Sequence, residues 1–296
     1  MSSERSAPSK TFLLGEYVAL DGGPSIILST APRFRLRITD KKPVSKGVAK
    51  PPFAPQSPAG RFLAKLGPKT AGFEFTDPHH GQGGLGASSA QFALVYSWAK
   101  RLESSDGIDW AALLAEYRAC ASSGEGTPPS GADVVAQLFG GICYFDGRSM
   151  KAERLRWEFP SLSFTLLRTG VKLATHEHLK HPQAAPHGAL RECVALARNA
   201  FLEKDESSLV AAVERCGAVL GEAGLTASAT VGLLRALRTQ ASGVRAAKGC
   251  GAMGSDVIAV LHDRDALGSL AKWVESKGLE TCGNEATLEA EGLKVE

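Results

Sequence analysis

The chain has 296 residues, of which 44% are hydrophobic and 22% charged, and its formal net charge is +3. This composition is typical of a soluble globular protein with one large domain or two ordinary ones. The mild, evenly mixed charge argues against nucleic acid as a partner. No apolar run reaches the roughly 20 residues that a membrane helix needs. The six cysteines are at least 23 residues apart, which excludes a CxxC or zinc pattern, and with the polar N-terminus this favours the cytoplasm.

In the first half of the chain, residues 1–9 are polar, and we expect them to form a disordered leading segment. Two apolar runs follow, interrupted at Gly15-Glu16, and residues 34–39 alternate like a half-buried strand. Prolines and lysines over 40–60 predict a surface loop. The next predicted elements are a helix from near Ala87, a helix capped by Asp109 and a strand over 141–145.

Residues 146–160 are expected to be a polar connection, so we divide the chain into lobes over 1–152 and 153–296. The second lobe is predicted to contain a strand from 162, three amphipathic helices near 188–203, 206–221 and 228–241, a buried strand over 256–261 and a last helix over 265–277. Strands and helices are mixed without a strict βαβα alternation, which indicates an α+β fold.

The stretch GQGGLGASSA at 81–90 allows two interpretations. Gly81, Gly83 and Gly86 match a dinucleotide fingerprint, but that motif should follow a hydrophobic strand, and here Asp77-Pro78 and two histidines precede it. The stretch fits a phosphate group better, because its glycines let the backbone approach an anion and the following helix directs N–H groups at it. A plain loop with serine caps remains an alternative.

Three further features favour phosphoryl transfer. Asp133 follows a Pro-Ser-Gly turn and precedes an apolar run, a second glycine loop runs from Lys248 to Asp256, and Lys10 lies early in the chain. Two of these features have a simpler explanation. Asp133 could be no more than a helix cap, and Lys10 could form a surface ion pair with Glu16.

Four motifs in the same order resemble the GHMP kinase superfamily: Lys10 with TFLLGEYVAL, GGLGASSA, PSGAD and KGCGAMGSDV. The resemblance implies two α+β lobes with the active site between them. The N-lobe would be similar to ribosomal protein S5 domain 2, and the C-lobe would be ferredoxin-like.

The resemblance also implies the roles of individual residues. ATP would bind over the glycine loop, with Mg²⁺ held by Ser88 or Ser89, and Asp133 and Lys10 would be catalytic. The residues implied for ATP are Gly83, Gly84, Leu85, Gly86, Ala87, Ser88 and Ser89. Those implied for the substrate are Glu16, Ser130, Gly131, Lys172, Gly251, Ala252 and Gly254.

Within the superfamily, the G-E-Y and T-G segments lean toward phosphomevalonate kinase, with mevalonate kinase as the alternative and a decarboxylase as a third possibility. The partner would then be a small anionic molecule, met by some of Lys172, Arg168 and Arg245, and the protein a monomer or homodimer. A non-catalytic sensor is a rival hypothesis. Its support is that Met253 and Ser255 replace motif glycines, and that Ser122 occupies a metal-binding glutamate position with Glu125 out of register.

Overall fold

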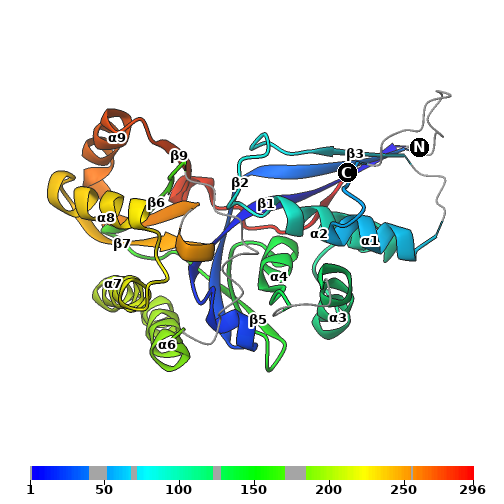
Figure 1. Ribbon diagram of the computed structural model, residues 1–296, viewed down its shortest axis with the longest axis horizontal. Helices are drawn as coiled ribbons and strands as arrows, with labels where there is room; N and C mark the ends of the chain where they lie inside the picture. The colour runs from blue at the N-terminus through cyan, green and yellow to red at the C-terminus, as the bar shows by residue number, and fades with distance from the viewer. Residues whose placement is uncertain (1, 40–51, 68–71, 123–127, 171–184, 255) are drawn as a thin grey trace.

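The structure is a computed structural model that describes residues 2–39, 52–67, 72–122, 128–170, 185–254 and 256–296. It contains two β-sheets, each with its own helices, that lie side by side along the long axis of the molecule (Figure 1). All strand pairs in both sheets are antiparallel. This is the mixed α+β architecture that the sequence predicts.

The first sheet has six strands in the order β10-β1-β2-β4-β5, with β3 also paired to β2. The strands are β1 (Ser2–Leu14), β2 (Pro24–Thr39), β3 (Gly72–Thr76), β4 (Ile142–Asp146), β5 (Lys151–Leu155) and β10 (Lys294–Val295). Helices α2 (Ala87–Ala99) and α4 (Ala132–Phe139) pack against one face of this sheet. Helices α1 (Pro58–Lys65) and α3 (Trp110–Ala121) pack against each other and extend the same core, with aromatic contacts to α2.

The second sheet has four strands in the order β7-β8-β6-β9: β6 (Leu162–Arg168), β7 (Val244–Cys250), β8 (Val257–Asp263) and β9 (Glu280–Asn284). Helices α6 (His187–Glu203) and α7 (Glu206–Glu222) cover one face, and α8 (Ser228–Gln240) and α9 (Leu267–Ser276) cover the other. In chain order this is a βαββαβ arrangement with β6 and β8 central, so the predicted ferredoxin-like lobe is confirmed.

Two-sided burial explains the continuous apolar run of β8. Val257, Ala259 and Leu261 face the core under α6 and α7, whereas Ile258 and Val260 face α8 and α9. A strand covered on both faces needs apolar residues at every position.

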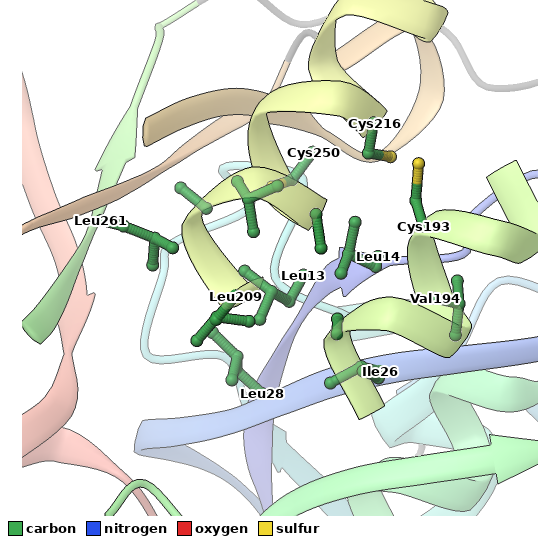
Figure 2. Close-up of a cluster of buried hydrophobic side chains, with 14 of the residues drawn as sticks. Leu13, Leu14, Ile26, Leu28, Cys193, Val194, Leu209, Cys216, Cys250 and Leu261 are labelled. Atoms are coloured by element: carbon green, nitrogen blue, oxygen red, sulfur yellow. The ribbon is translucent and has the colours of Figure 1, made fainter. Parts of the chain in front are cut away.

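The core under α6 and α7 also joins the two sheets. It contains Leu14, Ile26 and Leu28 from the first sheet together with Leu209 of α7 and Leu261 of β8 (Figure 2). Because these residues pack in one cluster, the lobes share apolar contacts at their junction. Figure 2 also shows the sulfur atoms of Cys193 and Cys216 pointing toward each other from the two helices. All six cysteines are buried and free.

Two expectations about the fold are wrong, and a third is wrong only at its end. Residues 1–9 are not a disordered lead, because β1 begins at Ser2 and pairs with both β2 and β10. The polar connection at 146–160 contains strand β5, which pairs with β4, so the first sheet continues past the predicted lobe boundary at 152. The loop expected over 40–60 ends in helix α1, capped by Ser57; residues 40–51 lie outside the described ranges.

The remaining predicted helices and strands are confirmed. The structure also bears on membrane association: within the ranges that it describes, no helix combines the length and the apolar character that a membrane span requires.

Candidate active site

The glycine loop leads directly into helix α2. Gly84 and Gly86 have φ angles of 90° and 93°, a conformation that disfavours residues with a Cβ, so glycine is required at both turns. Gly86 is the N-cap residue and brings no side chain to cap the helix. The first N–H groups of α2 therefore point toward a position where an anion can bind.

The two serines at this helix start differ in their surroundings. Ser89 is buried, and its hydroxyl donates a hydrogen bond of 3.0 Å to the carbonyl oxygen of Gly86. Ser88 is exposed to solvent. The hydroxyl of Ser88 is consequently the one that can reach a ligand or a metal ion without breaking a bond within the loop.

Lys10 of β1 lies against the glycine loop. Its backbone N–H donates to the carbonyl of Leu85 at 3.0 Å. A Cβ built on Gly86 would lie 2.8 Å from Cγ and 3.0 Å from Cε of Lys10. The absence of a side chain at Gly86 is thus what makes room for the Lys10 side chain beside the loop.

Helix α4 is hydrogen-bonded to the same part of the glycine loop. The Gln137 side-chain amide donates to the carbonyl oxygens of Gly86, at 3.1 Å, and Pro8, at 3.0 Å. Asp133 lies one helical turn earlier, on the same face of α4, because residues four apart in a helix are neighbours. Gln137 therefore links the helix that carries Asp133 to both β1 and the glycine loop.

The start of α4 packs tightly on helix α3. Gly131 has a φ of 77°, and a Cβ there would collide with the Leu114 side chain. Burial raises the pKa of Tyr117 on α3 well above its usual range, and the negative charge of Asp133 adds to this rise. The carbonyl of Ser130 accepts a hydrogen bond of 2.9 Å from Arg118. These contacts hold the turn before Asp133 in one position.

The second glycine loop meets the first. It follows β7 and contains the short 3-10 helix η3 (Ala252–Gly254). A Cβ on Gly84 would collide with the Asp256 side chain, and a Cβ on Gly251 would lie 3.5 Å from its carboxylate oxygen. The two loops are thus in direct contact. Met253 has a φ of 55°, and its N–H donates to the Tyr17 hydroxyl at 3.1 Å.

A buried ion pair lies next to this second loop. Glu16 does not pair with Lys10; its carboxylate accepts from the Lys248 ammonium at 2.8 Å, and the side chains are 8% and 0% exposed. Lys248 belongs to β7 rather than to the loop. The pair joins the turn after β1 to the strand that carries the second loop.

A cavity of about 290 Å³ opens beside the two loops. Its lining comes from the loop before α2, the end of β6 and the second glycine loop, and consists of His80, Gly81, Gln82, Gly83, Arg168, Gly170 and Asp256. Arg168 is the buried cation of this lining, at 8% exposure. Its side chain contacts the carbonyl of Gly83, at 3.4 Å.

No protein-family model matches the sequence, and no curated protein matches it. Solved structures resemble it over nearly its whole length. Mevalonate kinase of L. major, in complex with R-mevalonate, has a TM-score of 0.67 at 18% identity, covering 94% of both chains. Phosphomevalonate kinase of Streptococcus pneumoniae, in complex with phosphomevalonate and AMPPNP, has a TM-score of 0.75 at 15% identity, covering 96% of this chain and 99% of that one. Galactokinase of Lactococcus lactis, complexed with galactose, has a TM-score of 0.74 at 15% identity, covering 99% and 95%.

The chain has the GHMP kinase fold. At these identities the likeness describes the fold, and the acceptor differs among the three similar proteins. Within this fold, the residues from three of the four recognised motifs, namely Lys10, Gly86 and the α4 helix of Asp133, meet around one point.

Other predicted residues are separated from that point or fall outside the described chain. Lys172 and Glu125 lie outside the described ranges, as does the side chain of Ala252. Arg245 is at the start of β7, where it pairs with Asp263, so about 20 Å of strand separates it from the second glycine loop. A role for Arg245 in anion binding is therefore not supported by the fold.

Sequence reasoning missed two residues of this GHMP-fold site. Gln137 is a polar residue within the apolar run VVAQLF, four positions after Asp133, and that spacing was a usable signal. His79, one of the two histidines before the glycine stretch, is 6% exposed and hydrogen-bonded at both ring nitrogens. Nothing in its local sequence indicates these partners, which lie 70 and 89 residues away.

Proposed function

We propose that this protein is an ATP-dependent kinase of small anionic molecules, with phosphomevalonate as the acceptor. The observation that supports the proposal is that Lys10 and the helix that carries Asp133 both contact the glycine loop at Gly86. The helix does so through the hydrogen bonds of Gln137. A bare helix N-terminus, a lysine and a carboxylate around a glycine loop form a set suited to phosphoryl transfer, where positioning and charge stabilisation provide most of the rate.

In this proposal, ATP places its phosphates over residues 83–89, where the N–H groups at the start of α2 bind phosphate oxygens. Lys10 offsets the negative charge between Asp133 and the phosphoryl group that is transferred. Asp133 orients the attacking oxygen of the acceptor and takes its proton when that oxygen belongs to a hydroxyl. A phosphate oxygen is already anionic near neutral pH, so with phosphomevalonate the orienting role dominates.

Mg²⁺ fits the side chains at this site. Among the described residues there is no group of three or more His, Cys, Asp or Glu side chains that could hold a metal ion. Mg²⁺ is usually bound by one or two protein groups, waters and substrate phosphates, so such a group is not needed. We propose Ser88 as its protein ligand, because Ser89 is buried and donates to Gly86. The ion, when bound, neutralises charge on the phosphates.

Phosphomevalonate is proposed over mevalonate on sequence features, the G-E-Y and T-G segments. The S. pneumoniae phosphomevalonate kinase complex and the L. major mevalonate kinase complex both support a kinase of this acceptor class, and neither decides between the two acceptors. Mevalonate kinase therefore remains the second candidate.

The test is a coupled assay of ADP release with Mg-ATP and a panel of acceptors: (R)-mevalonate, 5-phosphomevalonate, 5-diphosphomevalonate, galactose and homoserine. Turnover with 5-phosphomevalonate that is lost in Asp133→Asn is the expected result. Turnover with mevalonate alone would identify mevalonate as the acceptor and would leave the proposed kinase activity in place. ATP binding without turnover on any acceptor would favour the non-catalytic sensor.

A further inference from the structure

His79, which lies just before the glycine stretch, is hydrogen-bonded at both ring nitrogens although it belongs to a loop. Its Nε2 is 2.6 Å from the Ser9 hydroxyl, and its Nδ1 is 3.2 Å from Nη2 of Arg168. Its ring also packs edge-on against Phe34, with centroids 5.6 Å apart. A buried histidine ring with two hydrogen bonds and an aromatic contact has a fixed orientation.

The partners of His79 determine which nitrogen carries the proton. A guanidinium can only donate, so Nδ1 must accept the bond from Arg168. The Ser9 hydroxyl donates its own hydrogen to the carbonyl of Pro32 at 2.7 Å, and its oxygen is therefore free to accept from the Nε2–H group. The chain of bonds is consistent with a neutral imidazole protonated at Nε2.

The Arg168 guanidinium has three hydrogen-bond partners, of which His79 is one. Its Nε donates to Glu280 at 3.2 Å, Nη2 to His79 at 3.2 Å, and Nη1 contacts the Gly83 carbonyl at 3.4 Å. A guanidinium has five N–H groups, so two of them have no partner among the described residues. Because Arg168 lines the cavity beside the glycine loops, these groups are available to a ligand there.

We infer that His79 is a positioning residue that fixes the Arg168 guanidinium so that it binds an anionic oxygen, from a phosphate or carboxylate, in this cavity. The inference rests on the proposed function for the origin of that anion, which is the phosphate chain of the nucleotide or the anionic group of the acceptor.

The experiment compares His79→Leu, which removes the acceptor for Arg168, with His79→Asn, whose side-chain oxygen lies where Nδ1 lies. Arg168→Lys is added because it keeps the charge and loses the planar fork. The matched control is Arg33→Lys, a guanidinium of similar burial that pairs with Glu289 away from the cavity. Circular-dichroism melting curves establish that each variant is folded. Isothermal titration calorimetry then measures the Kd of ADP, inorganic pyrophosphate and each acceptor of the panel, and the coupled assay measures KM and kcat.

We expect His79→Leu and Arg168→Lys to weaken binding of the anion by roughly tenfold to a hundredfold, the loss expected for a charged hydrogen bond. His79→Asn should recover most of the affinity, which a merely structural role of the imidazole ring would not allow. Weaker binding of ADP and pyrophosphate assigns the anion to the nucleotide, and a change confined to the acceptors assigns it to the acceptor.

Unchanged affinities in folded His79→Leu would overturn the positioning role of His79, and unchanged affinities in Arg168→Lys would overturn the anion site. Absence of binding by all these probes in the unmodified protein would also overturn it. Failure of the proposed function gives a different result: ADP or pyrophosphate still binds and the variants still weaken it, but no acceptor is phosphorylated.

Discussion

The ammonium of Lys248 lies 2.8 Å from the carboxylate of Glu16, and both side chains are buried where the turn after β1 meets β7. Burial by itself lowers the pKa of Lys248. The neighbouring groups, Cys250 and Glu16 first among them, outweigh this, so its pKa is raised. The lysine is thus charged at neutral pH, and its charge is balanced inside the protein by Glu16.

Removing one member of this pair should leave an uncompensated buried charge. We expect Lys248→Met and Glu16→Gln each to lower the free energy of unfolding by about 3–5 kcal/mol, and the double variant to lose less than the sum. Urea unfolding of the four proteins measures the coupling. Arg245→Met is the control: Arg245 lies on the same strand as Lys248, and its exposed pair with Asp263 of β8 should contribute at most about 1 kcal/mol. Additive losses from Lys248→Met and Glu16→Gln would show that the pair is not coupled.

Gly86→Ala should impair the site and the fold together. Its Cβ would approach Cγ of Lys10 to 2.8 Å and the Gln137 amide to 2.9 Å, at a φ that alanine disfavours. We expect kcat/KM to fall at least about tenfold, because Lys10 and Gln137 must both move, and stability to fall by about 1–3 kcal/mol. Gly107→Ala is the control, since Gly107 has a similar φ of 72° with nothing within 4 Å. Equal effects in both variants would mean that strain alone, and not the contact with Lys10, explains the loss.

Two substitutions on helix α4 should have different effects: Asp133→Asn should lower kcat, and Gln137→Leu should lower stability. Asp133 is only partly buried, so the asparagine should fold normally while kcat falls by about 10²–10⁴-fold. Gln137→Leu removes a buried hydrogen bond to Pro8 and a partly buried one to Gly86, and should cost about 1–3 kcal/mol of stability, visible in the melting temperature. A stable, fully active Asp133→Asn protein would remove Asp133 from the proposed chemistry.

The stability of the protein should depend on pH through His79. Burial, followed by the positive charge of Arg168, lowers the pKa of His79 below its ordinary value of 6.5; Asp77 and Glu280 oppose this shift, and His80 adds slightly to it. As the pH falls below 6.5, the unfolded chain takes up a proton that the folded protein resists. The free energy of unfolding is therefore at its full value above pH 6.5. It decreases as the pH falls from 6.5 to the lower pKa that His79 has in the folded protein.

Unfolding free energies measured between about pH 7.5 and about pH 5 should fall more steeply for the unmodified protein than for His79→Asn, which cannot take up this proton. The exposed neighbour His80 provides the control: His80→Gln should keep the slope of the unmodified protein. Identical slopes in all three proteins would contradict the prediction.

Most of the fold could be predicted because its signals are local. Helix α7 follows from the spacing of Leu209, Val213 and Cys216, all of which are buried, and α3 from its Asp109 cap. The start of β1 could not be predicted, because Ser6 and Ser9 are polar. Their burial depends on Arg33 and Pro32, more than 20 residues away, which provide their hydrogen-bond partners.

The same limit holds for the candidate site. Lys10, Gly86 and Asp133 lie in motifs whose residue order is visible in the sequence, and the fold brings the elements that carry them together. The pairing of Glu16 with Lys248 joins residues 232 positions apart, and no local pattern marks either as the partner of the other. Long-range polar contacts of this kind depend on the tertiary structure alone.

The pairing of β1 with β10 has a consequence for how the protein is made. Arg5 lies opposite Val295, and the backbone of Glu4 exchanges two hydrogen bonds with Glu296, so β10 covers the outer edge of β1 at residues 4–6. During synthesis on the ribosome, β1 emerges before the second lobe, so this stretch of its outer edge stays unpaired until the second lobe has been translated. The first sheet is therefore incomplete at residues 4–6 until β10 has been made, and this exposed edge is open to wrong strand pairing in a nascent chain.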